Sequence, residues 1–123
     1  MSQLRLHRRD VLLALGALAL GGAAWPRVGA APAGSAGRDL AARLRDPEAA
    51  RALGIRYLRQ HPEERSLAFL HAATLASAGE GARSVEALRA RCREDFQRGD
   101  TVLIDRWVLA RTECRLCALV ALS

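Results

Sequence analysis

Apolar residues recur at intervals of three and four along residues 38–98, with polar residues and turn formers between the runs. This spacing is typical of amphipathic α-helices, because it places the apolar side chains on one face. The predicted helices are at about 38–45, 47–60, 62–78 and 85–98. Pro47, after the N-cap residue Asp46, and Pro62 stand at first helical positions, and Ser84 is a third start signal.

Two features of these helices predict how they pack. The helix at 85–98 carries an apolar stripe that we expect to face the core, because its members are spaced by three, four and four residues. They are Val85, Leu88, Cys92 and Phe96. Gly54 lies in the middle of the helix at 47–60, where it weakens the helix but permits another element to approach closely.

The pattern changes after Gly99. Two short runs of β-branched and apolar residues, 101–104 and 107–109, are separated only by Asp105 and Arg106. Two residues between two strands predict a tight β-hairpin, although glycine would suit the position of Arg106 better. The alternative is one extended segment with a kink.

A last helix is predicted at 113–122, with Thr112 as its cap. The sequence therefore predicts a mainly α fold. It has about four short helices, with a small β-hairpin at about 101–109 before the last helix.

The first 30 residues have the order of a cleavable export signal. A basic start leads into an apolar run at 11–25, and small residues follow. Arg8, Arg9 and Leu12 form an Arg-Arg-x-apolar-Leu pattern that resembles a bacterial twin-arginine (Tat) signal. The apolar run is shorter than the roughly 20 residues that a membrane-spanning helix needs. An uncleaved membrane anchor and an ordinary secretory signal are the alternatives.

Signal peptidase would cleave between Ala30 and Ala31, where the side chains are small. Residues 31–37 are rich in glycine and alanine, which predicts a flexible linker before a small helical domain at 38–123. The chain has 19 basic and 13 acidic residues. Cleavage of the signal removes four basic residues and one acidic residue, so the mature net charge is +3. Only 4% of the residues are aromatic. Sparse charge and few stacking side chains exclude nucleic acid as a partner.

Three cysteines are the side chains most able to carry chemistry. Cys114 and Cys117 form a Cys-x-x-Cys pair near the start of the last predicted helix, where the helix dipole favours a thiolate. A thiol–disulfide redox protein is one hypothesis. The alternatives are a structural disulfide, between these two or from either to Cys92, and small buried thiols. The sequence has no second paired-ligand motif for zinc, so we expect no metal site.

No motif for a bound cofactor is present in the sequence, whether a glycine-rich dinucleotide loop, a Walker loop or a Cys-x-x-Cys-His haem site. The Tat route carries folded proteins, which commonly hold a cofactor or are bound to a partner that does. Either the speed of folding requires this route, or the small protein is exported as one member of a complex. We expect the second, with a periplasmic protein that has no cofactor and is exported with a protein partner. Its transient contacts would be the Tat translocase and signal peptidase, with membrane contact only during export.

Several stretches resemble one family. They are LGIRYL at 53–58 followed by Pro62, DF at 95–96, GDTV at 99–102, WVL at 107–109, TE at 112–113 and LCAL at 116–119. They are similar to small Tat-exported proteins associated with flavin-dependent dehydrogenases, such as the small subunit of gluconate 2-dehydrogenase. The flavin and haem of that family belong to other subunits, and no catalytic residue carries over. The resemblance implies a non-catalytic accessory subunit that escorts a larger, cofactor-containing oxidoreductase.

The predicted hairpin is the candidate docking surface for such a partner. Its apolar residues are Val102, Ile104, Trp107 and Leu109, and tryptophan is a residue type that often anchors interfaces. The alternative is that Trp107 covers the core of its own domain. A freestanding helical interaction module, without an enzyme partner, is the third functional hypothesis.

Overall fold

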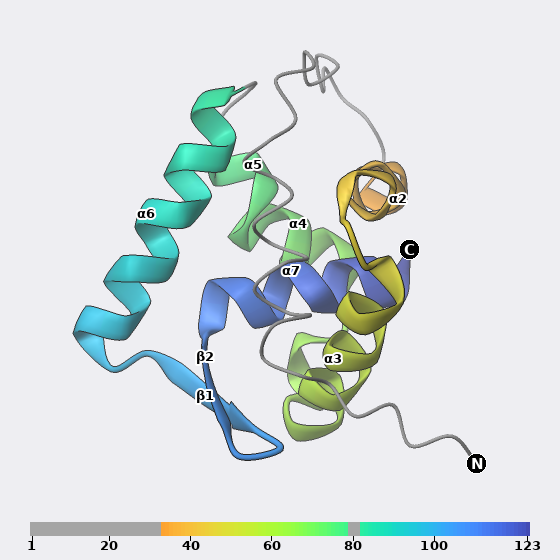
Figure 1. Ribbon diagram of the computed structural model, residues 1–123. Helices are drawn as coiled ribbons and strands as arrows, with labels where there is room; N and C mark the ends of the chain where they lie inside the picture. Colours follow the sequence, from red (N-terminus) through yellow and green to blue (C-terminus); the bar gives the residue numbers. More distant parts are fainter. Residues whose placement is uncertain (1–32, 79–81) are drawn as a thin grey trace.

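The computed structural model describes residues 33–78 and 82–123, and Figure 1 shows their arrangement. The elements are α2 (Ala33–Arg43), α3 (Pro47–Gln60), the 3-10 turn η2 (Pro62–Glu64), α4 (Leu67–Ala73), α5 (Leu75–Ala78), α6 (Ala82–Arg98), β1 (Thr101–Ile104), β2 (Trp107–Ala110) and α7 (Arg111–Leu122). The predicted mainly α fold, with a hairpin before the last helix, is confirmed. The predicted signal, including Arg8, Arg9, Leu12 and the cleavage point at Ala30 and Ala31, lies outside the described residues.

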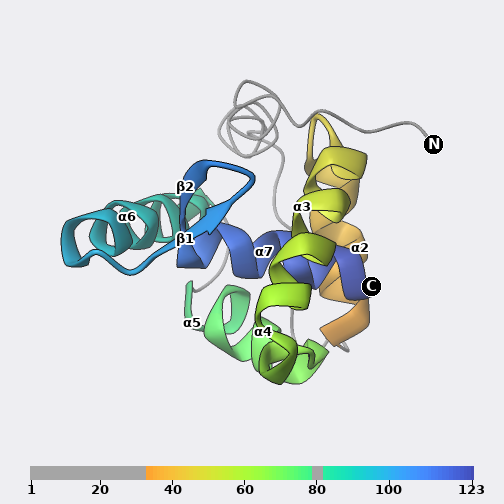
Figure 2. The ribbon, with the colours of Figure 1, turned by 90° about the horizontal axis from the view of Figure 1, so that it is seen from below.

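Helix α7 runs through the middle of the fold, with α2, α3, α4 and α6 packed against it (Figures 1 and 2). Its buried residues come from all sides of the helix: Thr112, Glu113, Cys114, Leu116, Cys117, Ala118, Leu119 and Val120. A helix that is buried on nearly all sides is enclosed by other elements. The last helix of the chain is therefore its core.

Helix α3 has the start and end that the sequence predicts. The Asp46 side chain accepts a hydrogen bond from the backbone N–H of Ala49 at 3.0 Å, and Pro47 occupies the first turn. The helix packs on α7 through Gly54. A Cβ atom at Gly54 would lie 2.1 Å from the carbonyl oxygen of Cys117 and 2.8 Å from the backbone nitrogen of Ala118. The predicted close approach at this glycine is thus a backbone contact between two helices.

The linker prediction is wrong from Ala33 onward, because α2 already begins there. Ala36 is buried, and a Cβ atom at Gly37 would lie 2.8 Å from the carbonyl oxygen of Leu119 in α7. Small side chains suggested flexibility, but here they let α2 lie close to the end of α7. Tertiary contact decides the conformation of this segment.

The single helix predicted at 62–78 is divided in the structure. Pro62 starts the short 3-10 turn η2, and α4 begins only after Ser66, whose Oγ accepts a hydrogen bond from the Phe69 N–H at 3.3 Å. Thr74 then separates α4 from α5, with its hydroxyl donating to the Leu70 carbonyl at 2.6 Å. Side chains that satisfy the backbone locally compete with the helix ladder, which explains both interruptions.

Helix α6 begins at Ala82, before the predicted cap Ser84, and lies at one edge of the fold (Figure 2). Its stripe is buried at Leu88, whereas Phe96 is 51% exposed. The prediction that Phe96 faces the core is therefore wrong. Asp95, one position before Phe96, is the residue of this turn that contacts α7, so the face of α6 that meets α7 here does not include Phe96.

The hairpin is confirmed with its two-residue turn. Ile104 pairs with Trp107 in antiparallel register, and Asp105 and Arg106 between them have φ values of 48° and 70°. Two successive left-handed residues match the right-handed twist of the strands. The turn is fastened to α3 by the ion pair of Arg56 with Asp105. Within the described part of the chain, no helix is long and apolar enough to span a membrane.

Candidate functional site

The hairpin residues predicted as a docking surface face inward. Val102, Ile104 and Leu109 are buried in the hydrophobic core, and Trp107 is half-buried against it. They cannot form the partner surface without unpacking the domain, so that prediction is corrected. The structure instead favours the alternative, in which Trp107 covers the core of its own domain.

The opposite face of the same hairpin is the exposed one. Leu103 is 62% exposed and Val108 is 57% exposed, and they stand directly opposite each other in the register. Side chains alternate between the two faces of a strand, so this pair points away from the buried set. Both faces are apolar in the sequence, and so alternation alone could not show which one meets the core. We call Leu103 and Val108 the outer hairpin pair.

The three cysteines are free thiols held inside the fold. Cys114 and Cys117 are buried in α7, and Cys92 of α6 is half-buried. Burial, followed by the nearby charge of Glu113, raises the pKa of both thiols in α7. Burial also raises the pKa of Cys92 to about 12. Thiol–disulfide exchange requires a thiolate that a partner can reach, so this environment opposes the redox hypothesis.

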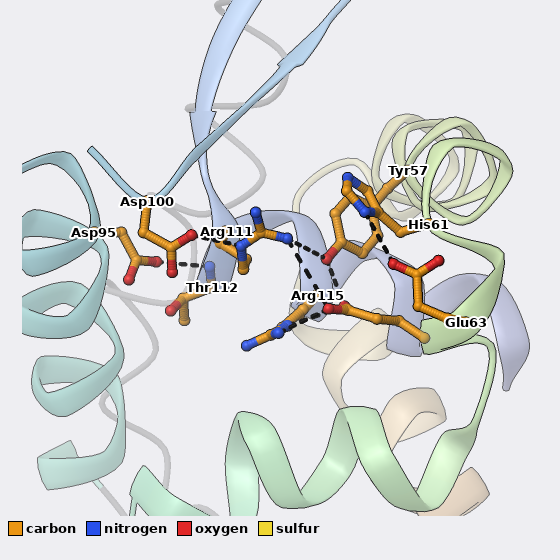
Figure 3. Close-up of polar contacts among 9 residues, drawn as sticks. Tyr57, His61, Glu63, Asp95, Asp100, Arg111, Thr112 and Arg115 are labelled. Atoms are coloured by element: carbon orange, nitrogen blue, oxygen red, sulfur yellow. Dashed lines mark hydrogen bonds and ion pairs between the residues drawn. The ribbon is translucent and has the colours of Figure 1, made fainter. Parts of the chain in front are cut away.

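A polar cluster missed by the sequence analysis joins α3 to α7 (Figure 3). The Tyr57 hydroxyl donates to Glu64 Oε2 at 2.5 Å, and Arg115 donates to the same carboxylate at 3.0 Å from Nε and at 2.7 Å from Nη2. Arg111 lies one helical turn before Arg115, and its Nη1 donates to the Tyr57 hydroxyl at 3.4 Å. We call Tyr57, Glu64, Arg111 and Arg115 the α3–α7 polar cluster.

The electrostatics of the cluster fix the charge of each member. The two-pronged hydrogen bond from Arg115 lowers the pKa of Glu64, so its carboxylate stays ionised despite its burial. Burial, and then the neighbouring Glu64 carboxylate, raises the pKa of Tyr57 to about 12. Near neutral pH the Glu64 carboxylate therefore stays ionised and the Tyr57 phenol stays protonated, so neither changes its protonation state. The cluster is suited to holding helices together rather than to acid–base catalysis.

A second group of contacts caps the start of α7. Ala110 is the N-cap residue and has no side-chain oxygen, and the predicted cap Thr112 lies inside the helix. Asp95 of α6 replaces the missing cap, because its Oδ2 accepts the Thr112 backbone N–H at 2.7 Å. Arg111 donates from Nε to Asp100 at 2.6 Å and so continues the network toward the α3–α7 polar cluster (Figure 3).

Two contacts with aromatic rings lie at the edge of the cluster. His61 stacks against the Tyr57 ring with centroids 4.8 Å apart, and its Nδ1 lies 3.3 Å from Glu63 Oε1. The Arg115 guanidinium lies over the Phe69 ring at 5.3 Å. Across residues 33–78 and 82–123, no group of three or more potential ligand side chains is placed to hold a metal ion.

Comparison of the chain with protein-family models, with curated proteins and with solved structures finds no match. The resemblance to dehydrogenase small subunits therefore stays a hypothesis based on the residues quoted for it.

Proposed function

We propose that the chain is an exported, non-catalytic accessory subunit, which binds a larger cofactor-containing oxidoreductase and accompanies it through the Tat pathway into the periplasm. The observation that carries the proposal is the order of residues 5–30, in which Arg8, Arg9 and Leu12 precede a short apolar run and small residues. A Tat signal on a small folded body supports a role in which folding, and hence any partner contact, precedes export.

The outer hairpin pair is the surface we assign to the partner. Leu103 and Val108 together place two large apolar side chains in solvent on one face of the sheet. The ion pair of Arg56 with Asp105 and the hydrogen bond from Gln60 to the Leu103 carbonyl, at 3.2 Å, fasten the hairpin to α3. A surface that is already held in place loses little conformational freedom on binding, which favours affinity.

The oxidoreductase nature of the partner rests on the sequence resemblance. The α3–α7 polar cluster supports the non-catalytic part of the proposal, because its charges pair with one another. The redox alternative is disfavoured, because the thiols of Cys114 and Cys117 are buried and their pKa is raised. A freestanding interaction module differs from an escort subunit only in its partner, so the experiment must identify what is bound.

The test is purification from the periplasm of the full chain carrying a C-terminal tag. We expect a larger protein to co-purify, and the eluate to reduce an artificial electron acceptor with the partner's substrate. The double variant Leu103→Asp/Val108→Asp should lose the partner. Ile55→Asp is the matched control, because Ile55 is also exposed but lies on α3. Elution of the wild-type chain alone, or equal recovery of partner by the double variant, would contradict the proposal.

A further inference from the structure

A buried carboxylate lies where α6 and the hairpin meet α7. Glu113 is only 5% exposed and stands in the first turn of α7. Its Oε1 atom has no hydrogen-bond partner among the described residues, while the backbone N–H of Ala110 hydrogen-bonds the carboxylate. An ionised carboxylate in such a place lacks the hydrogen bonds that water would give it, whereas the protonated acid loses less on burial.

The groups around Glu113 do not supply a compensating cation. The titratable and charged side chains at this corner are Arg91, Cys92 and Asp95 of α6, and Cys114, Cys117 and Arg111 of α7. The pKa of Glu113 is nevertheless set by burial and by the Ala110 backbone, and none of these cations lowers it. Asp95 accepts the Thr112 N–H at 2.7 Å, and Arg111 donates to Asp100 at 2.6 Å, so both are already engaged. From β2, the described contact is the Ala110 backbone. Ionised Glu113 would therefore add an unpaired negative charge beside Asp95.

This charge would disturb the contact between α6 and α7, which buries few large apolar side chains of α6. Helix α6 lies at the edge of the fold (Figure 2), and Leu88 is its one fully buried large apolar side chain among those the structure describes. Asp95 holds the start of α7 from this same helix. A small loss in the free energy of the α6–α7 contact can therefore release α6, while the contact between α3 and α7 is kept.

We propose that Glu113 is a proton-dependent latch, which holds α6 and the hairpin against α7 when protonated and loosens them when it releases its proton to water. The inference goes beyond the proposed function, because it concerns the chain alone and needs no partner.

The direction of the pH dependence follows from burial. Burial raises the pKa of Glu113 to about 7, against an ordinary value of 4.5 in the opened form. The closed contact therefore keeps its full stability below pH 4.5 and loses it as the pH rises through 7. Between pH 5.5 and pH 8 these two values predict that opening of the corner becomes about 30-fold more frequent.

Amide hydrogen exchange on the full chain, corrected for the intrinsic effect of pH, measures this opening. We expect protection of α6 and of the first turn of α7 to fall about 30-fold between pH 5.5 and pH 8, while α3 changes little. Glu113→Gln, which cannot ionise, should show no such fall. Glu94→Gln is the matched control, because Glu94 is an exposed acid on α6, and it should behave as the wild type.

Protection of α6 that is independent of pH in the wild type, or that falls equally in Glu113→Gln, overturns the latch. A carbon-13 titration of the Glu113 carboxyl group in the wild-type chain decides the matter without any variant. A midpoint near pH 7 supports the proposal, and a midpoint near 4.5 overturns it.

Discussion

Replacing Gly54 by alanine introduces a methyl group between two helix backbones. Its Cβ would lie 2.1 Å from the carbonyl oxygen of Cys117 and 2.5 Å from the carbonyl carbon of that residue. Ordinary contacts between heavy atoms are about 3.5 Å, so α3 and α7 would have to separate by roughly 1 Å or more. Neither neighbour is the flexible end of a side chain, so the clash cannot be relieved by a rotamer change.

The expected cost is set by two opposing effects. Overpacking costs about 1–3 kcal/mol, and a backbone clash belongs at or above the top of that range. Alanine recovers about 1 kcal/mol through its better helix propensity. We therefore expect the free energy of unfolding to fall by about 2 kcal/mol or more, and the melting temperature to fall by roughly 10 °C.

Urea unfolding of the full chain, followed by circular dichroism, measures the change. Arg51→Ala is the control on the same helix, because Arg51 is exposed, and it should stay within about 0.5 kcal/mol of the wild type. An unchanged or higher stability of Gly54→Ala would refute the argument, because it would mean that the two helices do not touch at this point.

Two other substitutions test the turn and the α3–α7 polar cluster. Arg106→Gly should raise the unfolding free energy by about 0.5–1 kcal/mol, because Arg106 has a φ of 70° that glycine adopts without strain; a loss of stability in the same urea experiment would contradict this. Glu64→Gln should lower the unfolding free energy at pH 7 by about 2–3 kcal/mol, since it leaves the half-buried Arg115 without its carboxylate. The pKa of Glu64 is lowered in the folded chain, so its contribution is present above pH 4.5 and is lost as the pH falls through the folded value. The gap between wild type and variant should therefore close in acid, and a gap that persists at pH 2 would show that charge is not the cause.

The sequence was a good guide wherever local chemistry decides the structure. Asp46 and Pro47 define the start of α3, and the two residues between the strands define the hairpin turn. Gly54 was also recognised as a place of close approach. For the helix start and the turn, a few adjacent residues contain the whole reason for the conformation, whereas the glycine shows that a close approach is possible but not which element makes it.

The sequence was a poor guide wherever the structure depends on a contact between residues far apart along the chain. The helical start of α2 depends on Gly37 lying against the end of α7. Phe96 is exposed because α6 meets α7 at this turn through Asp95 instead. The pairing of Glu64 with Arg115 joins residues 51 positions apart. In a chain with 19 arginines, nothing local shows which one a given acid will meet.

The outer hairpin pair and Glu113 illustrate the same limit at the candidate site. Both faces of the hairpin are apolar, so only the position of α7 shows that Leu103 and Val108 are outside. Glu113 has the usual place of an acid in a first helical turn, which suggests exposure. It is buried because α6, and not solvent, covers the start of α7.

The most direct test of the account replaces Arg8 and Arg9 together by lysine in the tagged full chain. This keeps both positive charges, so it tests recognition of the arginine pair rather than the basic start of the segment. The amount of tagged chain in the periplasm is compared with that of the wild type, with a Sec-exported protein as the control for fractionation. We expect the double-lysine variant to remain in the cytoplasm with its partner, and unchanged secretion would contradict the account.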